Sequence, residues 1–343
     1  MRNSASASAG AVADAPRPSL KLALRDHAAR ALFWTGRTAA ARRPRQHLVA
    51  VTFHRVLPRG QIAEYPFPGL CVTPDELGWF LAQFAPAYEC LPFGEAAARH
   101  REGRSRRPLL AITFDDGALD NVEHAAPVLE AAGVRATFFL PVEAIERREA
   151  LWHDELGFAV QALPPPDAAT PDHPGSARTA VARAKAMPAA ERRRWIDALR
   201  TAAPQAEVPA WASLMSWEDA RALRDAGHEI GSHSMSHDIL TGCSDAALHR
   251  EIADSKRDLE TRLGPIESFC YPNGDHDARC HRELAAAGYR QACTTAWGDN
   301  PPGTPPFVYR RFDMDAARVR SRHGALSPAL LAWRMSRWFR GPR

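Results

Sequence analysis

The sequence lacks any long apolar run. No stretch of 18 consecutive apolar residues occurs among its 343 residues, so we expect no helix that crosses a bilayer. Residues 1–18 are rich in Ala and Ser and contain no apolar core of the kind that a secretory signal requires. We therefore expect a disordered tail and no export. The remaining composition, with 45% hydrophobic and 24% charged residues, is typical of a globular protein.

Cysteine is scarce, and its spacing forms no framework. The six cysteines, at positions 71, 90, 243, 270, 280 and 293, include no CxxC pair. This pattern gives no indication of a disulfide scaffold or a cysteine zinc site, and it predicts reduced thiols in a cytoplasmic protein. A net charge of +4 identifies no partner, because the excess Arg collects in the terminal segments. We expect no nucleic-acid partner.

Two basic, amphipathic segments flank the centre of the chain. Residues 19–45 contain Phe33 and Trp34 among several arginines, and residues 321–343 repeat this combination around Trp333. A basic amphipathic helix that carries Trp and Phe can lie in a membrane interface. The alternative is that each helix packs on the outside of the folded core. The predicted location is thus cytoplasmic, with peripheral contact to the inner face of the membrane as a candidate interaction.

A pair of adjacent carboxylates follows an apolar run. Residues 109–112 predict a buried strand, and Asp115, Asp116 and Gly117 come directly after its end. Because adjacent residues of a strand point to opposite faces, one carboxylate can bind a cation while the other stays free to accept a proton. The alternative is an Asp that caps the next helix.

Two histidines follow a second short strand-like segment. If the chain turns helical after His233, then His237 lies on the same helix face. Two imidazoles and one carboxylate around an open position form a common catalytic zinc site. An isolated HxxxH more often marks a solvated helix face, so the metal interpretation depends on the Asp pair.

The motifs TFDDG at 113–117 and HSMSH at 233–237 together resemble those of the polysaccharide deacetylases of the NodB-homology type, carbohydrate esterase family 4. The resemblance covers roughly residues 46–314. It implies an α/β protein, an irregular (β/α) barrel of about seven strands whose site lies at the C-terminal strand ends.

The same resemblance assigns roles to the motif residues. Asp115 would be the general base, and Asp116, His233 and His237 would hold a divalent metal. Zn²⁺ suits two imidazoles and a carboxylate, although Co²⁺, Ni²⁺ and Fe²⁺ suit them as well.

Residues 163–210 interrupt the alternation of strands and helices. A linker with five prolines precedes an Ala- and Arg-rich helical stretch over 177–201. We expect a helical insertion in a barrel that occupies residues 46–320, beside the active-site mouth, where loops adapt a barrel to its substrate. Segment 152–156, with the sequence WHDEL, can border the same groove.

The third motif of the family departs from its usual form. The family commonly has R-x-P-Y, and here Cys270 takes the Arg position and Asn273 the Tyr position. A backbone donor survives a side-chain change, so the N–H of Asn273 is our candidate oxyanion donor. For the missing Arg we favour Arg311 over Arg310, at the tip of the last strand, as the partner that orients the catalytic Asp.

The late histidine that protonates the leaving amine in this family is not recognisable here. His54, after the first barrel strand, is our candidate for this acid, and His276 is the next choice; a structural hydrogen bond is the alternative for His54.

The predicted function is a metal-dependent deacetylase. It would remove N-acetyl groups from hexosamines of a polysaccharide or lipid-linked glycan during exopolysaccharide or cell-envelope biosynthesis. One alternative is a hydrolase of the same fold that acts on another non-peptide C–N bond. The other is a non-catalytic scaffold that binds glycan, because the third and later motifs are altered.

Overall fold

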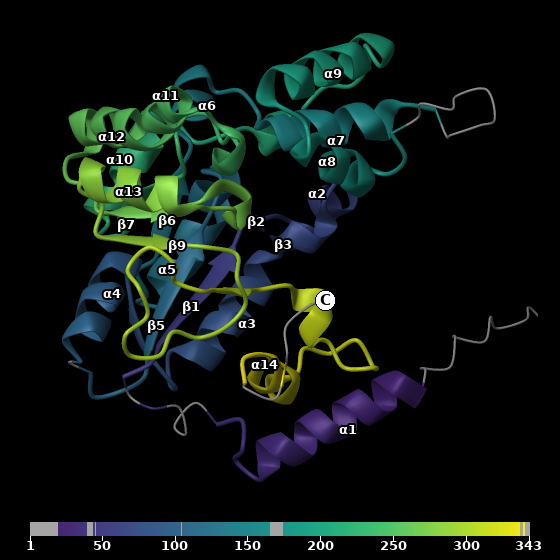
Figure 1. Cartoon of the computed structure of the whole chain (residues 1–343). Helices are drawn as coiled ribbons and strands as arrows, with labels where there is room; N and C mark the ends of the chain where they lie inside the picture. Colours follow the sequence, from purple (N-terminus) through teal and green to yellow (C-terminus); the bar gives the residue numbers. More distant parts are fainter. Residues whose placement is uncertain are drawn as a thin grey trace, which may run out of the picture.

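Strands and helices alternate along most of the chain and build a curled parallel sheet with helices around it (Figure 1). The structure is a computed structural model, and it describes residues 20–39, 44, 46–103, 105–164, 174–336 and 339. Its main sheet has the order β10-β1-β5-β6-β7-β8-β9, with β4 also paired to β5, and all its strand pairs are parallel.

The strands of this sheet have the following bounds: β1 Leu48–Phe53, β4 Glu89–Leu91, β5 Leu109–Phe114, β6 Thr137–Leu140, β7 Glu229–Ser232, β8 Ser268–Cys270, β9 Gln291–Cys293 and β10 Phe312–Asp313. A parallel bridge between Cys293 and Tyr309 links β9 to the segment that enters β10. The α/β barrel-like fold of about seven strands expected from the sequence is therefore confirmed. Two short strands, β2 (Arg55–Val56) and β3 (Cys71–Val72), pair with each other outside this sheet.

Side chains along the two central strands, β1 and β5, point alternately to the two faces of the sheet and so contribute to two separate apolar clusters. Every residue of both strands is buried. Val49 and Ile112 pack with the surrounding helices, whereas Ala50 and Ala111 belong to a second apolar cluster on the opposite face. Because side chains repeat every two residues, the second face continues upward through Thr113 towards Asp115.

The helices that surround the sheet begin and end at these residues: α2 Arg59–Glu64, α3 Pro74–Phe84, α4 Phe93–Glu102, α5 Ala126–Ala131, α6 Val142–Arg147, α7 Trp152–Ala162, α10 Trp217–Asp225, α11 Asp245–His249, α12 Ser255–Leu263 and α13 Ala278–Ala287. Capping boxes begin α3 and α10, at Thr73 with Glu76 and at Ser216 with Asp219. In both, the side chains satisfy backbone N–H groups that a helix start leaves free.

Two further helices lie in the predicted insertion, α8 (Ala177–Lys185) and α9 (Ala189–Ala202). Both pack against α7, mainly through small or aliphatic side chains such as Ala180, Ala184 and Ile196. Residues 165–173 of the proline-rich linker lie outside the described residues. The division of the chain into barrel, insertion and terminal helices stays a prediction.

At the two ends of the described chain, α1 (Leu20–Trp34) packs against α14 (Pro328–Arg334) (Figure 1). Both helices are shorter than the segments predicted from the sequence. The chain leaves α1 through a turn in which Gly36 has a φ of 68°, a conformation that suits glycine. The tail over 1–18 and the last residues of 321–343 lie outside the described residues. Within the described chain no helix is long and apolar enough to span a membrane.

Candidate active site

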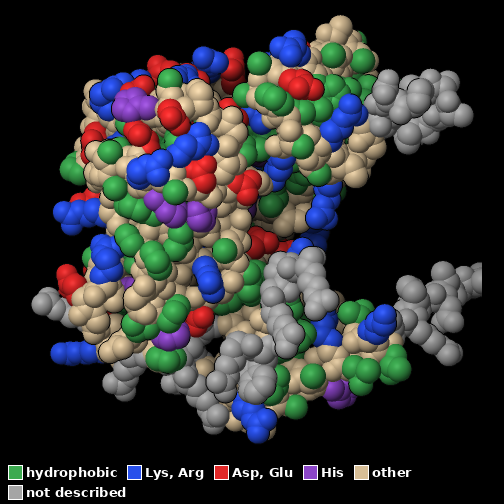
Figure 2. All heavy atoms as spheres, viewed as in Figure 1, with side chains coloured by type: hydrophobic (Ala, Val, Ile, Leu, Met, Phe, Trp, Pro, Cys, Tyr) green, Lys and Arg blue, Asp and Glu red, His purple; other side chains and the backbone are tan. Residues whose placement is uncertain are grey.

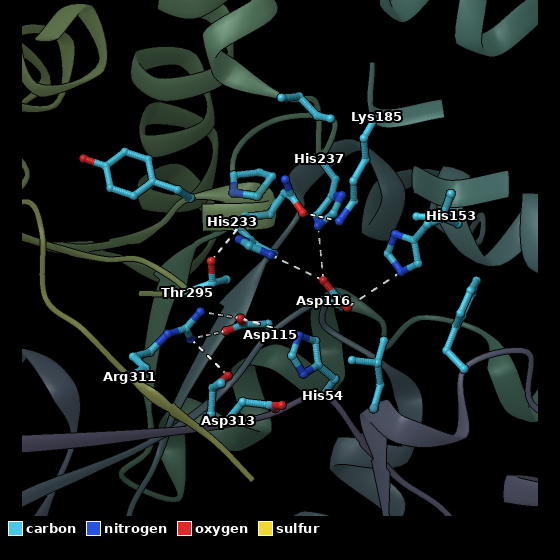
Figure 3. A pocket seen from close by; sticks show the side chains of 18 of the residues that line it. His54, Asp115, Asp116, His153, Lys185, His233, His237, Thr295, Arg311 and Asp313 are labelled. Atoms are coloured by element: carbon cyan, nitrogen blue, oxygen red, sulfur yellow. Dashed lines mark hydrogen bonds and ion pairs between the residues drawn. The ribbon is translucent and has the colours of Figure 1, made fainter. Parts of the chain in front are cut away.

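Asp115 lies at the upper end of β5 and is held by a buried arginine (Figure 3). The guanidinium of Arg311 donates two hydrogen bonds of 2.7 Å, one to each carboxylate oxygen. It also donates to the hydroxyls of Thr52 and Thr113, at 3.1 and 3.0 Å. Burial raises the pKa of Asp115, but the charge and hydrogen bonds of Arg311 outweigh burial and hold it below its usual value. The carboxylate is therefore ionised and fixed in orientation.

Arg311, and not its exposed neighbour Arg310, makes this contact. The two residues precede β10, and only the second points its side chain across the barrel mouth. The structure thus brings the preferred arginine to the Asp that it was predicted to orient, 196 positions away.

Replacing Arg311 with Leu is expected to lower the free energy of unfolding by about 3–5 kcal/mol, because Asp115 would remain as a buried charge without its partner. Urea denaturation measures the loss. Arg310→Leu is the matched control, and for an exposed side chain we expect a change within about 0.5 kcal/mol. Equal losses in the two variants would show that the ion pair contributes nothing specific.

Three other side chains converge beside Asp115. The Nε2 atoms of His233 and His237 each lie 3.3 Å from the same oxygen, Oδ1, of Asp116. All three residues are buried, and their ligand atoms lie within 4.8 Å of one another. Asp116 reaches this position because its φ of 74° turns the backbone away from the strand that ends at Phe114.

The two histidines do not share a helix, which corrects the expectation of a helical turn after His233. Residues 233–237 form an irregular loop in which Ser234 and His237 have φ values of 68° and 59°. Glu251 holds this loop, since its carboxylate accepts hydrogen bonds from the N–H groups of Met235 and Ser236 at 3.1 and 2.9 Å. Loop hydrogen bonds, and not helical spacing, bring the imidazoles together.

Two of the three side chains in this cluster are in the protonation state that binds a cation. Nδ1 of His233 lies 2.8 Å from the carbonyl of Cys270, so it donates there and its Nε2 faces Asp116. Burial lowers the pKa of His233, but Cys270 and the hydrogen bond with Asp116 outweigh burial and raise it well above its usual value, so a metal would displace the proton on Nε2. Burial lowers the pKa of His237 to about 4, which keeps that imidazole neutral. Burial raises the pKa of Asp116, but hydrogen bonds with both imidazoles outweigh it and keep the carboxylate ionised. Neutral imidazole and ionised carboxylate are the forms that bind metals.

The spacing of these atoms also fits one ion. Ligands about 2.0–2.1 Å from a tetrahedral Zn²⁺ lie about 3.3 Å apart, which matches the distances from Asp116 to both histidines. A second group of Asp115, His233 and Cys270 is similarly close. It fits less well, because Arg311 occupies both oxygens of Asp115 and burial raises the pKa of the Cys270 thiol, whereas thiolate is the ligand form.

Asp115 and Asp116 open into one pocket of about 460 Å³. His54 lines it, with Nε2 3.9 Å from Oδ2 of Asp115, and Asn273 lines it at the end of a tight turn with a φ of 59°. His276, the second choice for the acid, instead stacks on His281 with ring centroids 4.9 Å apart, and it does not line this pocket.

Two basic side chains of this pocket, His153 and Lys185, were not predicted from the sequence. His153 on α7 places Nε2 3.9 Å from Oδ2 of Asp116, and the neighbouring Asp154 accepts a hydrogen bond from Tyr65 at 2.6 Å. The WHDEL segment was expected to border the groove, but nothing in it singled out its histidine. Lys185 extends from the insertion to the side-chain oxygen of Asn273 (Figure 3).

The insertion therefore forms one wall of the pocket. Val181 and Lys185, one helical turn apart on α8, both line it. Figure 2 shows a hollow in the surface below helices α7, α8 and α9. Trp152 of α7 also donates a hydrogen bond of 3.0 Å to the carbonyl of His237, and the guanidinium of Arg192 from α9 lies 4.7 Å from the centre of the Trp152 ring. The helices of the insertion and α7 thus both border the pocket and position the backbone of His237, a candidate metal ligand.

Comparison with known families and structures agrees with this geometry. A family model described as polysaccharide deacetylase matches residues 102–292. The match includes both Asp–Asp and His–His motifs, whereas His54 and Arg311 lie outside it. Comparison of the sequence with curated proteins gives no significant match.

Several solved structures share the fold at low sequence identity. The deacetylase PplD from Streptococcus pyogenes, in complex with acetate, superposes with a TM-score of 0.58 at 16% identity, over 84% of this chain and 98% of that one. IcaB from Ammonifex degensii gives a TM-score of 0.50 at 19% identity, over 78% and 91%. The BpsB deacetylase domain from Bordetella bronchiseptica gives 0.50 at 18% identity, over 79% and 97%. At such low sequence identities, these similarities show a shared fold and do not by themselves show a shared activity.

Proposed function

The chain belongs to the polysaccharide deacetylase family, and from this premise we propose that it is a metal-dependent hydrolase of N-acetylated hexosamines in a polysaccharide or lipid-linked glycan. The observation that supports the proposal most directly is the convergence of Asp116, His233 and His237 beside a carboxylate that belongs to another ion pair. We further propose that the reaction serves exopolysaccharide or cell-envelope biosynthesis at the cytoplasmic face of the membrane.

The proposed mechanism divides the work between the two adjacent carboxylates. A divalent ion held by Asp116, His233 and His237 would supply Lewis acidity and lower the pKa of a bound water. Asp115 accepts the proton of the water that attacks the acetamide carbonyl, and Arg311 holds the orientation in which it does so.

Two further residues would act on what the attack produces. The N–H of Asn273 donates to the oxyanion of the tetrahedral intermediate. His54, whose Nε2 lies 3.9 Å from Oδ2 of Asp115, then protonates the amine as it leaves. Acetate and a free amino sugar are the products.

Release of acetate tests this proposal. The full chain is incubated with a set of N-acetylhexosamine oligomers, with and without a chelator. We expect acetate from at least one oligomer, loss of release with the chelator, and recovery on adding Zn²⁺, Co²⁺, Ni²⁺ or Fe²⁺ separately, since only a bound cation would activate the water.

Two results would favour the alternatives. Ring opening of a small cyclic amide, with no acetate from any oligomer, would indicate a hydrolase of another C–N bond. A bound metal with no turnover of any substrate would indicate a glycan-binding scaffold.

His54→Gln is expected to reduce kcat about 10²-fold or more, the usual contribution of a general acid, without changing the metal content. His276→Gln is the matched control, since this histidine stacks on His281 outside the pocket, and we expect its rate to stay near that of the unmodified enzyme. A slow His276→Gln with a normal His54→Gln would reverse the assignment.

A further inference from the structure

Helix α1 carries apolar residues on two sides, and the structure covers only one of them. On the covered side Asp26 accepts a hydrogen bond of 2.7 Å from the N–H of Arg322, close to α14. On the other side Leu20, Leu24 and Trp34 are 75%, 63% and 80% exposed. Spacings of 4 and 14 residues, about one and four helical turns, place these three on one stripe. We call this stripe the outer face of α1.

The concentration of apolar side chains on α1 is unusual within the described residues. All the large hydrophobic side chains that are exposed there belong to this one helix: Leu20, Leu22, Leu24, Phe33 and Trp34. Helical spacing places Leu20, Leu24 and Trp34 on the outer face and Leu22 and Phe33 on the opposite side. Scattered exposed apolar residues need no explanation, but large apolar side chains gathered on one helix mark an interaction site.

Basic side chains border the outer face. Lys21, Arg30 and Arg37 are exposed, and none of them forms an ion pair with another described residue. In Figure 2 green hydrophobic and blue basic side chains lie together at the lower right edge, over the helix labelled α1 in Figure 1. An apolar stripe flanked by cations is complementary to a surface whose outermost layer is anionic and whose next layer is apolar.

A groove of about 550 Å³ lies beside this face, between α1 and the segment that precedes α14. Its lining combines Arg30 and Arg322 with His27 and His323, and Trp34 lies at the same groove. The one carboxylate of the lining, Asp26, already accepts hydrogen bonds from Arg25 and from the N–H of Arg322. Guanidinium groups are the preferred partners of phosphate oxygens, because their planar N–H pairs bind two oxygens at once. The groove therefore offers a site for a phosphate headgroup next to side chains that suit acyl chains.

We propose that the outer face of α1 and this groove dock the protein on a membrane that contains anionic phospholipid. Leu24 and Trp34 enter the boundary between headgroups and acyl chains, and Arg30 and Arg322 bind the phosphates. Trp has the apolar body and single polar N–H that suit this boundary, and basic residues add attraction to anionic lipid. This interaction is separate from the hydrolase reaction, and it would bring the pocket to a lipid-attached substrate.

Vesicle co-sedimentation of the full chain tests the proposal. We expect binding to vesicles of phosphatidylcholine with phosphatidylglycerol at least about tenfold tighter than to phosphatidylcholine alone, and weaker binding as salt is raised. The double variant Leu24→Glu with Trp34→Glu should lose binding by about tenfold or more, because charge replaces the inserting groups. Arg30→Glu with Arg322→Glu should weaken binding at least about fivefold per residue and only to the anionic vesicles.

Arg194→Glu, an exposed change of the same charge on α9, is the matched control and should bind as the unmodified chain does. Circular dichroism and acetate release from a water-soluble oligomer should be unchanged in all variants, since none touches the pocket. Vesicle binding needs no turnover, so an inactive chain that binds would leave this proposal intact. Unchanged binding by the Leu24 and Trp34 variant would overturn it. The proposal would also be overturned if light scattering showed a dimer that the Leu24 and Trp34 changes dissociate, and if the unmodified chain bound no vesicles.

Discussion

Asp115→Asn is expected to lower kcat for acetate release about 10²–10⁴-fold while the metal content stays that of the unmodified enzyme. The amide has nearly the same shape as the carboxylate, but it cannot accept the proton of the attacking water. Metal content is unaffected because the three proposed ligands are other residues, and both oxygens of Asp115 are already bound to Arg311. Single-turnover kinetics and elemental analysis of the same preparation measure the two quantities.

Asp313→Asn is the matched control for this change, since it alters another carboxylate that lines the same pocket without a contact to Arg311. We expect its rate to fall by much less. Normal turnover by Asp115→Asn would show that the base is another group. Loss of metal from Asp115→Asn would instead favour the second group of Asp115, His233 and Cys270 as the ligand set.

His237→Ala is expected to abolish both metal binding and turnover. The imidazole is one of only three donors in the proposed site, and a two-donor site binds a divalent ion weakly. Two hydrogen bonds position the backbone of His237: its N–H donates to the hydroxyl of Ser234 at 3.0 Å, and Trp152 donates to its carbonyl. Isothermal titration of the metal-free protein with Zn²⁺ measures the loss directly.

Alanine variants of two other histidines give Zn²⁺ affinities with which that of His237→Ala can be compared. His153→Ala should weaken Zn²⁺ binding about 10–100-fold, as is usual for an outer partner of a ligand, because it lies beside Asp116 without belonging to the ligand set. His276→Ala should leave binding unchanged. Equal affinity for His237→Ala and the unmodified protein would remove the metal site on which the proposed chemistry depends.

Much of the fold could be predicted from local patterns. Residues 109–114 form a strand that is buried on both faces, as the apolar run over 109–112 predicts. Period-two alternation also explains why Asp115 faces the same side as Ala111 and Thr113. It did not predict the placement of Asp116, because the strand ends at Phe114 and a left-handed residue follows.

The loop at 233–237 shows why local spacing was insufficient there. The spacing of four positions from His233 to His237 suggested a helix, but the carboxylate of Glu251 offers the backbone N–H groups of this loop another partner. That competition depends on Glu251, which lies 14 positions beyond His237 in the helical segment 250–254 that follows α11. The same result, two imidazoles on one carboxylate oxygen, was reached by a different backbone path.

The sequence by itself determined the chemistry that can occur: adjacent carboxylates after a strand, a pair of histidines after another, and a parallel α/β frame that carries both. These features are local, since strand alternation and turn chemistry act over a few residues. Tertiary structure alone decided that Arg311 reaches Asp115, that His153 and Lys185 join the pocket, and that one side of α1 stays exposed. Each of these depends on contacts between segments far apart in the chain, which closure of the sheet and packing of the helices fix and which residue spacing does not encode.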